Sequence, residues 1–363
     1  NGDVPLITTA TTRSLVEASA GARLVLLAVT LDEPFGYGRI VRDAQGRPCA
    51  IVEEKDASDA ERAIRETYTG VLAAPTAWLK RAVMALDSHN AQQEFYLTDL
   101  VAAAVRDGLP VSVVEAADAI EGAGVNDPGQ LAALERRLQR REAERLMAAG
   151  VRLADPARFD LRGTITLKPR DPRFIDIAID VGCVFEGTVV LGDGVIIGAH
   201  CVIRDAVIEA GAVIQPFTHI VGATIGADAQ VGPFARLRPG TELGAEVHIG
   251  NFVEVKNSTL ARGAKANHLA YLGDATVGER VNYGAGSITA NYDGANKHRT
   301  VIGDDVHVGS NCVLVAPVTL GAGATIGGGS TIVEDAPAAQ LTLARAPQVS
   351  LKRWQRPKKA GKG

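Results

Sequence analysis

Aliphatic or large apolar residues recur at every sixth position through most of the second half of the chain. The positions are Ile179, Phe185, Leu191, Ile197 and Ile203; Ile208, Ile214 and Ile220; Ile225, Val231, Leu237, Leu243, Ile249 and Val255; and Ile302, Val308, Leu314, Leu320, Ile326 and Ile332. With 46% of all residues hydrophobic, the first, third and fourth of these runs would be apolar throughout by chance with a probability on the order of 10⁻⁶.

A period of six matches neither the 3.6-residue turn of an α-helix nor the two-residue repeat of a strand. Each hexad is therefore expected to be one short strand and a turn, with three hexads closing a triangular coil and coils stacking about 4.8 Å apart. A small or β-branched residue lies two positions before most of these apolar residues, so both positions should face inward. Cys183 and Cys201, which are three hexads apart, should stack in adjacent coils. The spacing thus predicts a parallel β-helix.

The composition suits such a solenoid, because 39 glycines accompany only 4% aromatic residues in 363, which favours repeated turns over an aromatic core. With 22% charged residues and a net charge of −4, the protein is expected to be globular and cytoplasmic, with neither nucleic acid nor a membrane as partner. No apolar stretch reaches the ~18 residues that span a bilayer. The four cysteines form no CxxC pair, so we expect reduced thiols rather than a zinc site.

The first part of the chain has a different pattern. Residues 24–113 alternate short aliphatic runs with amphipathic stretches, which is typical of an α/β domain. Leu131, Leu134 and Leu138 then share one face of a segment whose acids and arginines are interspersed, which predicts a connecting helix rather than a nucleic-acid-binding arm. We therefore expect an α/β part, a linker helix, and a β-helix with a C-terminal tail, at residues 1–127, 128–150 and 151–363.

The six-residue spacing fails between Val255 and Val277 and again between Tyr283 and Ile302. Breaks in a solenoid map to loops, where binding groups gather. His268 lies in the first break and is a candidate general base, because histidine titrates near neutral pH, although a lone histidine is more often structural. Two nearby cations, Arg238 and Lys256, are candidates for holding a phosphate or, alternatively, belong to a solvated rim.

The second half of the chain contains the motifs Gly232-Pro-Phe-Ala-Arg-Leu-Arg-Pro-Gly240, Gly250-Asn-Phe-Val-Glu-Val-Lys256, Asn267-His-Leu-Ala-Tyr-Leu-Gly-Asp274, Asn282-Tyr-Gly-Ala-Gly286 and Asn291-Tyr-Asp-Gly-Ala-Asn-Lys297. These motifs resemble those of the bacterial bifunctional N-acetylglucosamine-1-phosphate uridyltransferase and glucosamine-1-phosphate acetyltransferase family. In the first half, Gly36-Tyr-Gly-Arg-Ile40, Glu94-Phe-Tyr-Leu-Thr-Asp99 and Gly124-Val-Asn126 resemble the second half of the family's Rossmann-like nucleotidyltransferase domain. The resemblance implies a left-handed β-helix, against the usual right-handed crossover rule.

For the β-helix, the resemblance implies transfer of the acetyl group of acetyl-CoA to the amino group of glucosamine-1-phosphate. It also implies a homotrimer whose sites lie between neighbouring subunits, with His268 as the catalytic base. The implied contacts to glucosamine-1-phosphate are Arg238, Lys256, Tyr271 and Asn282, and those to acetyl-CoA are Ala285, Asn291, Tyr292, Ser310, Gly328 and Arg345, where the family usually has alanine in place of Gly328.

For the first part, the resemblance implies uridyl transfer from UTP to N-acetylglucosamine-1-phosphate, giving UDP-N-acetylglucosamine and pyrophosphate. Asp3 and Asn126 are the implied oxygen ligands of Mg²⁺, and Gly38, Glu53, Tyr68 and Asn126 are the implied contacts to the substrate. Tyr68 stands where the family has asparagine. The family's glycine-rich phosphate loop is not found in these 363 residues, so we expect no uridyl transfer by this polypeptide itself.

Other functions also use a solenoid. A bare scaffold, or a non-catalytic β-helix attached to a sugar-nucleotide pyrophosphorylase, explains the hexads but not the polar residues in the register breaks. A γ-type carbonic anhydrase holds zinc with histidines between β-helix subunits, whereas His200, His219, His248 and His268 show no paired ligand spacing. Acetyl transfer is therefore the favoured function.

Overall fold

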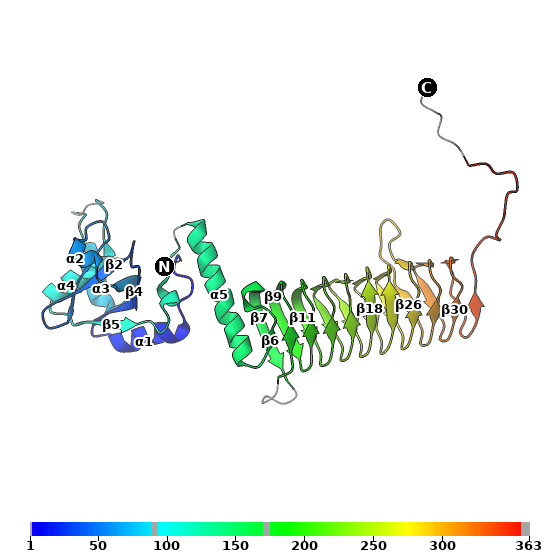
Figure 1. The fold of residues 1–363 in the computed structure, drawn as a ribbon, viewed down its shortest axis with the longest axis horizontal. Coiled ribbons are helices and arrows are strands. Elements are labelled where there is room, and N and C mark those ends of the chain that lie inside the picture. The colour runs from blue at the N-terminus through cyan, green and yellow to red at the C-terminus, as the bar shows by residue number, and fades with distance from the viewer. Residues whose placement is uncertain (1, 89–92, 126, 170–174, 357–363) are drawn as a thin grey trace, which may run out of the picture. The chain divides into compact units, whose positions relative to one another are not determined.

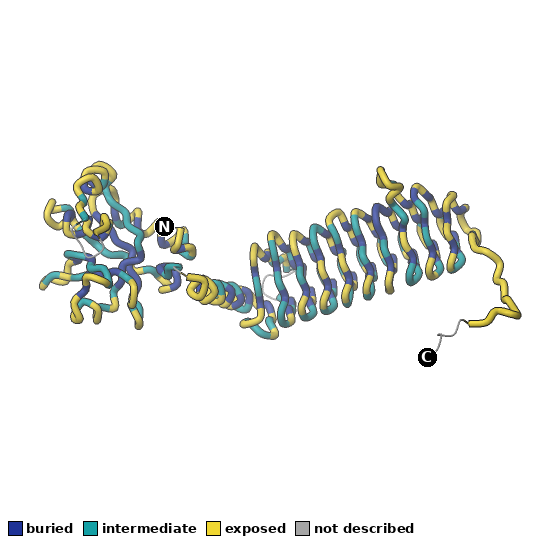
Figure 2. The backbone as a smooth tube through the Cα atoms, turned by 90° about the horizontal axis from the view of Figure 1, so that it is seen from above, coloured by how far each residue is buried: buried dark blue, intermediate teal, exposed yellow. Residues whose placement is uncertain are grey.

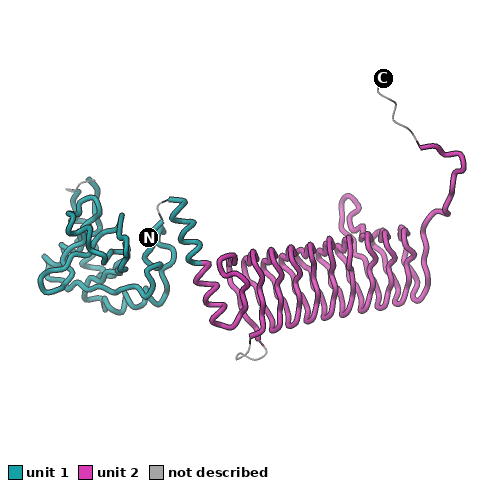
Figure 3. Tube along the Cα trace, in the orientation of Figure 1, with its two compact units in different colours: residues 1–138 teal, residues 139–363 magenta. Residues whose placement is uncertain are grey.

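The computed structural model describes residues 2–88, 93–125, 127–169 and 175–356. The chain divides into two compact units, residues 1–138 and 139–363 (Figure 3). The boundary between them falls inside helix α5 (Pro128–Ala148), where the sequence predicts a connecting helix. Within the described ranges, no helix is both long and apolar enough to cross a membrane.

The first unit has an α/β fold, as predicted. Its described strands form one sheet in the order β3-β2-β4-β1-β5, in which β1 pairs parallel to β5 and antiparallel to β4. Strand β1 is buried on both sides, because Leu24 and Leu26 pack with residues of α3 and α4 and Val25 and Leu27 pack with Leu15 of α1. The elements are α1 (Thr9–Ser19), β1 (Leu24–Thr30), β2 (Gly38–Arg42), β3 (Pro48–Val52), α2 (Asp59–Arg62), β4 (Glu66–Ala73), α3 (Thr76–Met84), η1 (Leu97–Asp99), α4 (Leu100–Arg106), β5 (Val111–Glu115) and η2 (Ala119–Gly122).

The second unit is a left-handed parallel β-helix, which confirms the predicted fold class. Strands of successive coils pair in parallel at an offset of about three hexads; Val213, for example, pairs with both Ile196 and Gln230. The early elements are β6 (Arg152–Leu153), η3 (Pro156–Arg158), β7 (Phe159–Lys168), β8 (Ala178–Ile179), β9 (Cys183–Gly192), β10 (Ile196–Ile197), β11 (Val202–Ile208), β12 (Val213–Ile214), β13 (His219–Val221), β14 (Ala223–Ile225), β15 (Gln230–Val231), β16 (Arg236–Leu237) and β17 (Thr241–Leu243).

The later coils carry most of the predicted acetyl-transfer residues. Their strands are β18 (His248–Asn251), β19 (Glu254–Lys256), β20 (Thr259–Leu260), β21 (Lys265–His268), β22 (Tyr271–Gly273), β23 (Ala275–Val277), β24 (Asn282–Tyr283), β25 (Ile288–Ala290), β26 (Thr300–Ile302), β27 (His307–Val308), β28 (Val313–Val315), β29 (Val318–Leu320), β30 (Thr325–Ile326), β31 (Thr331–Ile332) and β32 (Leu341–Thr342).

The interior of the β-helix is filled as the spacing predicts. The six-spaced residues belong to one continuous hydrophobic core, the residues two positions before them are also buried, and buried segments recur in every coil in Figure 2. Because Val184 pairs with Val202, the fully buried Cys183 and Cys201 lie side by side in adjacent coils, as expected. All four cysteines are free.

Glycine often follows the apolar marker because the next coil comes too close for a side chain. A Cβ added to Gly309 would lie 2.5 Å from the main-chain nitrogen of Gly328 in the next coil. Close approach of the backbones, rather than an unusual φ, explains glycine at this position.

The predicted break between Val255 and Val277 is wrong. Strands β20 to β23 continue the coils, and Leu260, Ala266 and Leu272 are buried in the core. The turn at one corner contains one residue fewer when its residue has a left-handed conformation, as at Asn257 (φ +46°) and Asp274 (φ +50°). This shorter turn shifts the six-residue spacing and produces the apparent break.

The second predicted break is a true insertion. It lies between β25 and β26, where the loop of residues 291–299 projects from the coils (Figure 1). This insertion lengthens the offset between paired strands, so that Asn282 pairs with His307 and not with a residue three hexads ahead.

Tyr283 puts a polar atom into the apolar core. Its side chain is buried, its hydroxyl has no hydrogen-bond partner among the described residues, and burial raises its pKa. A buried hydroxyl without a partner costs stability, so Tyr283→Phe is expected to raise the free energy of unfolding by about 1 kcal/mol. Chemical denaturation followed by circular dichroism measures this change. A lower midpoint for the variant would mean that the hydroxyl is bonded in the folded protein.

Candidate active site

One corner of the β-helix carries the predicted base and three of the predicted acetyl-CoA contacts. The parallel register places one residue from each of five successive coils in a row along this corner. Main-chain hydrogen bonds between adjacent coils run beside the row, for example from Asn311 N to Ala285 O and from Gly329 N to Ser310 O, both 2.8 Å. The row, called here the corner row, consists of Asn251, His268, Ala285, Ser310 and Gly328.

His268 ends strand β21 on this corner, and its side chain is exposed. Its ring Nδ1 lies 2.7 Å from the side-chain Oδ1 of Asn251, the residue paired with it in the preceding coil. Because an amide oxygen only accepts, Nδ1 carries the hydrogen in this contact. In the neutral ring the lone pair therefore remains on Nε2, which is the state that a general base needs.

The predicted phosphate-binding cations share one face of the β-helix. Arg238 and Lys256 occupy equivalent positions in adjacent coils, and each is held by an acid. The Arg238 guanidinium is 2.8 Å from a carboxylate oxygen of Glu254, and the Lys256 ammonium is 3.2 Å from one of Asp274. These ion pairs hold the two cations side by side, which suits a ligand with several anionic oxygens.

Tyr271 lies on this face, at the start of strand β22. Two residues later, Gly273 pairs with Lys256 and so occupies the position in its coil that Arg238 and Lys256 occupy in theirs. A Cβ added to Gly273 would lie 2.3 Å from the Tyr271 hydroxyl. The ring of Tyr271 thus lies over Gly273, where only glycine leaves room for it.

The inserted loop brings two further predicted residues and another cation to the far end of this face. Asn291 begins the loop and donates a hydrogen bond from its side chain to Asp274, and its carbonyl oxygen accepts from His298 N at 2.9 Å. Tyr292 is exposed. Asp274 accepts a hydrogen bond from Lys256 and, with its negative charge, raises the pKa of Lys256 against the effect of burial, while the charge of Lys256 lowers the pKa of Lys297. Two lysines and one carboxylate therefore meet here.

The remaining predicted residues lie elsewhere on the β-helix. Asn282, on strand β24, faces outward, and its side-chain nitrogen lies 3.2 Å from Nδ1 of His307. Strand β24 belongs to the sheet that ends at the corner row, whereas Lys256 lies in the other sheet. Arg345 donates to the carbonyl oxygen of Gly328 at 2.8 Å and so lies at the end of the row. Within one chain, the predicted contacts thus occupy two faces and the corner between them.

Four residues of this site were not predicted from the sequence. Asn251 orients His268, Glu254 holds Arg238, Asp274 holds Lys256 and Asn291, and Lys297 reaches Lys256. The length of one coil could have pointed to two of them, because Asn251 precedes His268 by 17 residues and Asp274 precedes Asn291 by 17 residues.

The first unit brings four of the predicted uridyl-transfer residues together in one cavity of about 660 Å³. Asp3, Gly38, Glu53 and Tyr68 all line it. Glu53 accepts from the hydroxyl of Thr98 at 3.1 Å. Tyr68 is buried and its hydroxyl has no hydrogen-bond partner within the described part of the chain; burial and, less strongly, Glu53 raise its pKa. This hydroxyl is therefore free to bond a ligand that enters the cavity.

Of the two residues predicted to bind Mg²⁺, the structure describes one. Asp3 lies on the cavity, where its carbonyl oxygen accepts from Val125 N at 2.9 Å, but Asn126 lies outside the described residues. Over the described ranges, no group of three or more histidine, cysteine, aspartate or glutamate side chains could hold a metal ion.

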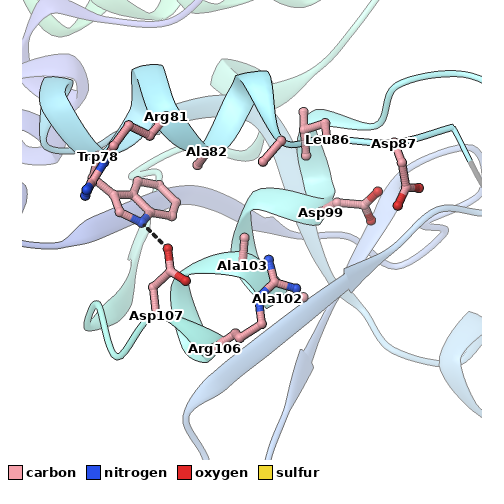
Figure 4. Close-up of a pocket in the computed structure, with 11 residues that line it drawn as sticks. Trp78, Arg81, Ala82, Leu86, Asp87, Asp99, Ala102, Ala103, Arg106 and Asp107 are labelled. Atoms are coloured by element: carbon pink, nitrogen blue, oxygen red, sulfur yellow. Dashed lines mark hydrogen bonds between the residues drawn. The ribbon is translucent and has the colours of Figure 1, made fainter.

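A second cavity of the first unit contains none of the predicted residues (Figure 4). It lies between α3 and α4, and Arg81, Asp87, Asp99 and Arg106 are among the residues that line it. Trp78 donates from its ring nitrogen to Asp107 at 2.9 Å. Because none of the residues predicted from the sequence lines it, we assign it no part in the site.

Comparison with known families agrees with the repeat. Residues 299–334 match the model described as bacterial transferase hexapeptide (six repeats), and residues 175–249 match the model of the GMPPB C-terminal domain. Among solved structures, the UDP-N-acetylglucosamine acyltransferase of Francisella novicida is similar at 18% identity and a TM-score of 0.35, over 51% of this chain and 65% of that one.

Close relatives cover the whole chain. The bifunctional protein GlmU of Methylibium petroleiphilum is 71% identical over 362 residues, which are 99% of this chain and 77% of that protein. The bifunctional protein GlmU of an Acidovorax species is 63% identical over 369 residues, covering 100% of this chain and 78% of the relative. The chain therefore belongs to the family of the bifunctional protein GlmU, the uridyltransferases and acetyltransferases whose motifs it carries.

Proposed function

We propose that the β-helix transfers the acetyl group of acetyl-CoA to the amino group of glucosamine-1-phosphate, with His268 as the general base. The family makes UDP-N-acetylglucosamine by this acetyl transfer and by uridyl transfer from UTP. One observation carries the assignment of the base: His268 is exposed on a corner, held at Nδ1 by Asn251, and flanked by a cationic face and by the row of small residues.

The reaction follows from these positions. The lone pair on Nε2 of His268 takes a proton from the amino group of the sugar as its nitrogen attacks the thioester carbonyl carbon. The new C–N bond forms, the C–S bond breaks, and CoA leaves as the thiol after taking up a proton. Arg238 and Lys256 bind the phosphate of the sugar, which fixes the amine in place for attack.

The corner row suits acetyl-CoA, which is long and has an extended pantetheine arm. Ala285, Ser310 and Gly328 have small side chains, so a ligand can approach the backbone of three successive coils. Arg345, bonded to the Gly328 carbonyl at the end of the row, supplies a cation for the phosphates of CoA. Asn291 and Tyr292 of the inserted loop complete the proposed contacts.

We propose that the active form is a homotrimer. Lys256 and Asn282 lie on different faces of a triangular coil, and these faces diverge from their shared corner. A ligand as small as glucosamine-1-phosphate cannot touch both in one chain. Two neighbouring copies can present one face each to the same cleft, so the site is complete only in the assembly.

The cavity of the first unit is proposed to bind the sugar nucleotide through Gly38, Glu53 and Tyr68. A side chain at Gly38 would lie 2.8 Å from Ile51 and near Glu53, so glycine keeps the cavity open. We propose Asp3 and Asn126 as the ligands of Mg²⁺, which supplies positive charge to the phosphates when bound.

The contact between Asn251 and His268 gives a direct test of the proposed base. Asn251→Ala removes the acceptor that fixes the tautomer and orientation of the ring, so kcat for acetyl transfer should fall about tenfold, as expected for one lost hydrogen bond. The release of CoA thiol measures the rate. Because Asn251 touches neither substrate in this scheme, both KM values should stay the same. An unchanged kcat would show that His268 is not the base or does not depend on this contact.

A further inference from the structure

Asp274 is a buried carboxylate that connects three successive coils. Its side chain is 8% exposed and accepts hydrogen bonds from Lys256 at 3.2 Å, from Asn257 at 2.5 Å and from Asn291. Asn257, Asp274 and Asn291 are each 17 residues apart and follow one another along a single corner of the β-helix. One carboxylate thus binds a residue proposed for the sugar phosphate and a residue proposed for acetyl-CoA.

The fold does not require an acid at this corner. Asp274 has a φ of +50°, and the preceding coils place Asn257, Gly240 and Gly222 there, all with positive φ. Asparagine or glycine therefore satisfies the backbone. Burying a carboxylate costs free energy unless it is paired and hydrogen-bonded, so the acid at 274 must be explained by its partners.

Those partners explain it. Burial alone would raise the pKa of Asp274, but the hydrogen bonds from Asn257, Asn291 and Lys256 outweigh it and lower the pKa, so the carboxylate is ionised at neutral pH. The charge holds the Lys256 ammonium at one position. The bond to Asn291 anchors the start of the inserted loop, and this loop carries Lys297 back towards Lys256. With one acid between two lysines, a net positive charge remains for a phosphate.

We propose that Asp274 is a positioning residue that couples the two substrate sites, holding Lys256 for the sugar phosphate and Asn291 with its loop for acetyl-CoA. The inference rests on the proposed acetyl transfer. Asp274 touches neither substrate; it acts through side chains that do. Loss of its charge should therefore weaken both substrates together, which loss of Lys256 or of Asn291 alone should not do.

The test is steady-state acetyl transfer by the full chain with Asp274→Asn, varying each substrate in turn. KM for glucosamine-1-phosphate and KM for acetyl-CoA should both rise about tenfold, with a smaller change in kcat. Lys256→Ala should raise mainly the first KM, and Asn291→Ala mainly the second. Asp205→Asn is the matched control, because Asp205 has a φ of +48° at the same corner but is exposed and far from the site; both of its KM values should remain unchanged.

Several outcomes would overturn the proposal. If Asp274→Asn lowers the melting temperature but leaves both KM values within twofold of the unchanged protein, Asp274 is only structural. If one KM rises alone, the sites are not coupled through it. Should Asp274→Asn not fold, Asp274→Gly repeats the test with the residue found at Gly222 and Gly240, and failure of both to fold would also make Asp274 structural. Absence of acetyl transfer by the unaltered chain would instead contradict the proposed function itself.

Discussion

His268→Ala is expected to lower kcat for acetyl transfer by about 10²- to 10⁴-fold, the usual contribution of a general base. The imidazole accepts the proton that the sugar nitrogen must lose, and the structure leaves Nε2 exposed for this purpose while Asn251 binds Nδ1. KM for either substrate should change little, because the phosphate and CoA are held by other residues. Release of CoA thiol over time measures kcat.

The control for this variant is His200→Ala. His200 is also an exposed histidine on the same corner, but it stacks on Phe217 several coils before His268, so its loss should leave the acetyl-transfer rate unchanged. Circular dichroism and the oligomeric mass should match in both variants. Comparable rates for the two variants would rule out His268 as the base.

Lys256→Ala is expected to raise KM for glucosamine-1-phosphate by about 10²-fold, because it removes a charge that binds the phosphate and leaves the buried Asp274 unpaired to repel it. The ion pair of Lys256 and Asp274 is largely buried, with side-chain exposures of 17% and 8%, so solvent screens this repulsion only weakly. Initial rates over a range of sugar-phosphate concentrations measure the change.

Two comparisons sharpen this prediction. Lys168→Ala removes a lysine of the first coil from an exposed ion pair with Glu209 and should have no effect on KM. Glucosamine without its phosphate should be a poor substrate for the unaltered protein, and Lys256→Ala should make it little worse. An equal loss on both substrates would mean that Lys256 does not bind the phosphate.

The β-helix could be predicted because one position in each short strand decides which side chain is buried. Phe185 and Ile203 follow that rule, and a spacing of three hexads was enough to stack Cys183 on Cys201. The corners could not be predicted in the same way. A turn made by a left-handed residue such as Asn257 or Asp274 takes one residue fewer, and this shift imitates a break in the repeat.

The site residues came from motifs, and the residues that hold them were missed. Asn251 and Asp274 act on partners in the next coil, and such contacts become visible only when the length of each coil is known. Arg238 and Lys256 were predicted, whereas Glu254 and Lys297 beside them were not, because charge along the sequence does not show which coils stack. The spacing of apolar residues in one chain likewise does not show how copies of the chain assemble.

Acetyl transfer by the intact chain is the measurement that tests the central claim most directly. Mixed with acetyl-CoA and glucosamine-1-phosphate, the protein should release CoA thiol and form N-acetylglucosamine-1-phosphate in equal amounts, as followed by thiol detection and mass spectrometry. N-acetylglucosamine-1-phosphate in place of the amine should give no release, since it has no free amino group to react. If thiol release with glucosamine-1-phosphate does not exceed the hydrolysis of acetyl-CoA alone, the β-helix is a scaffold and His268 has no catalytic role.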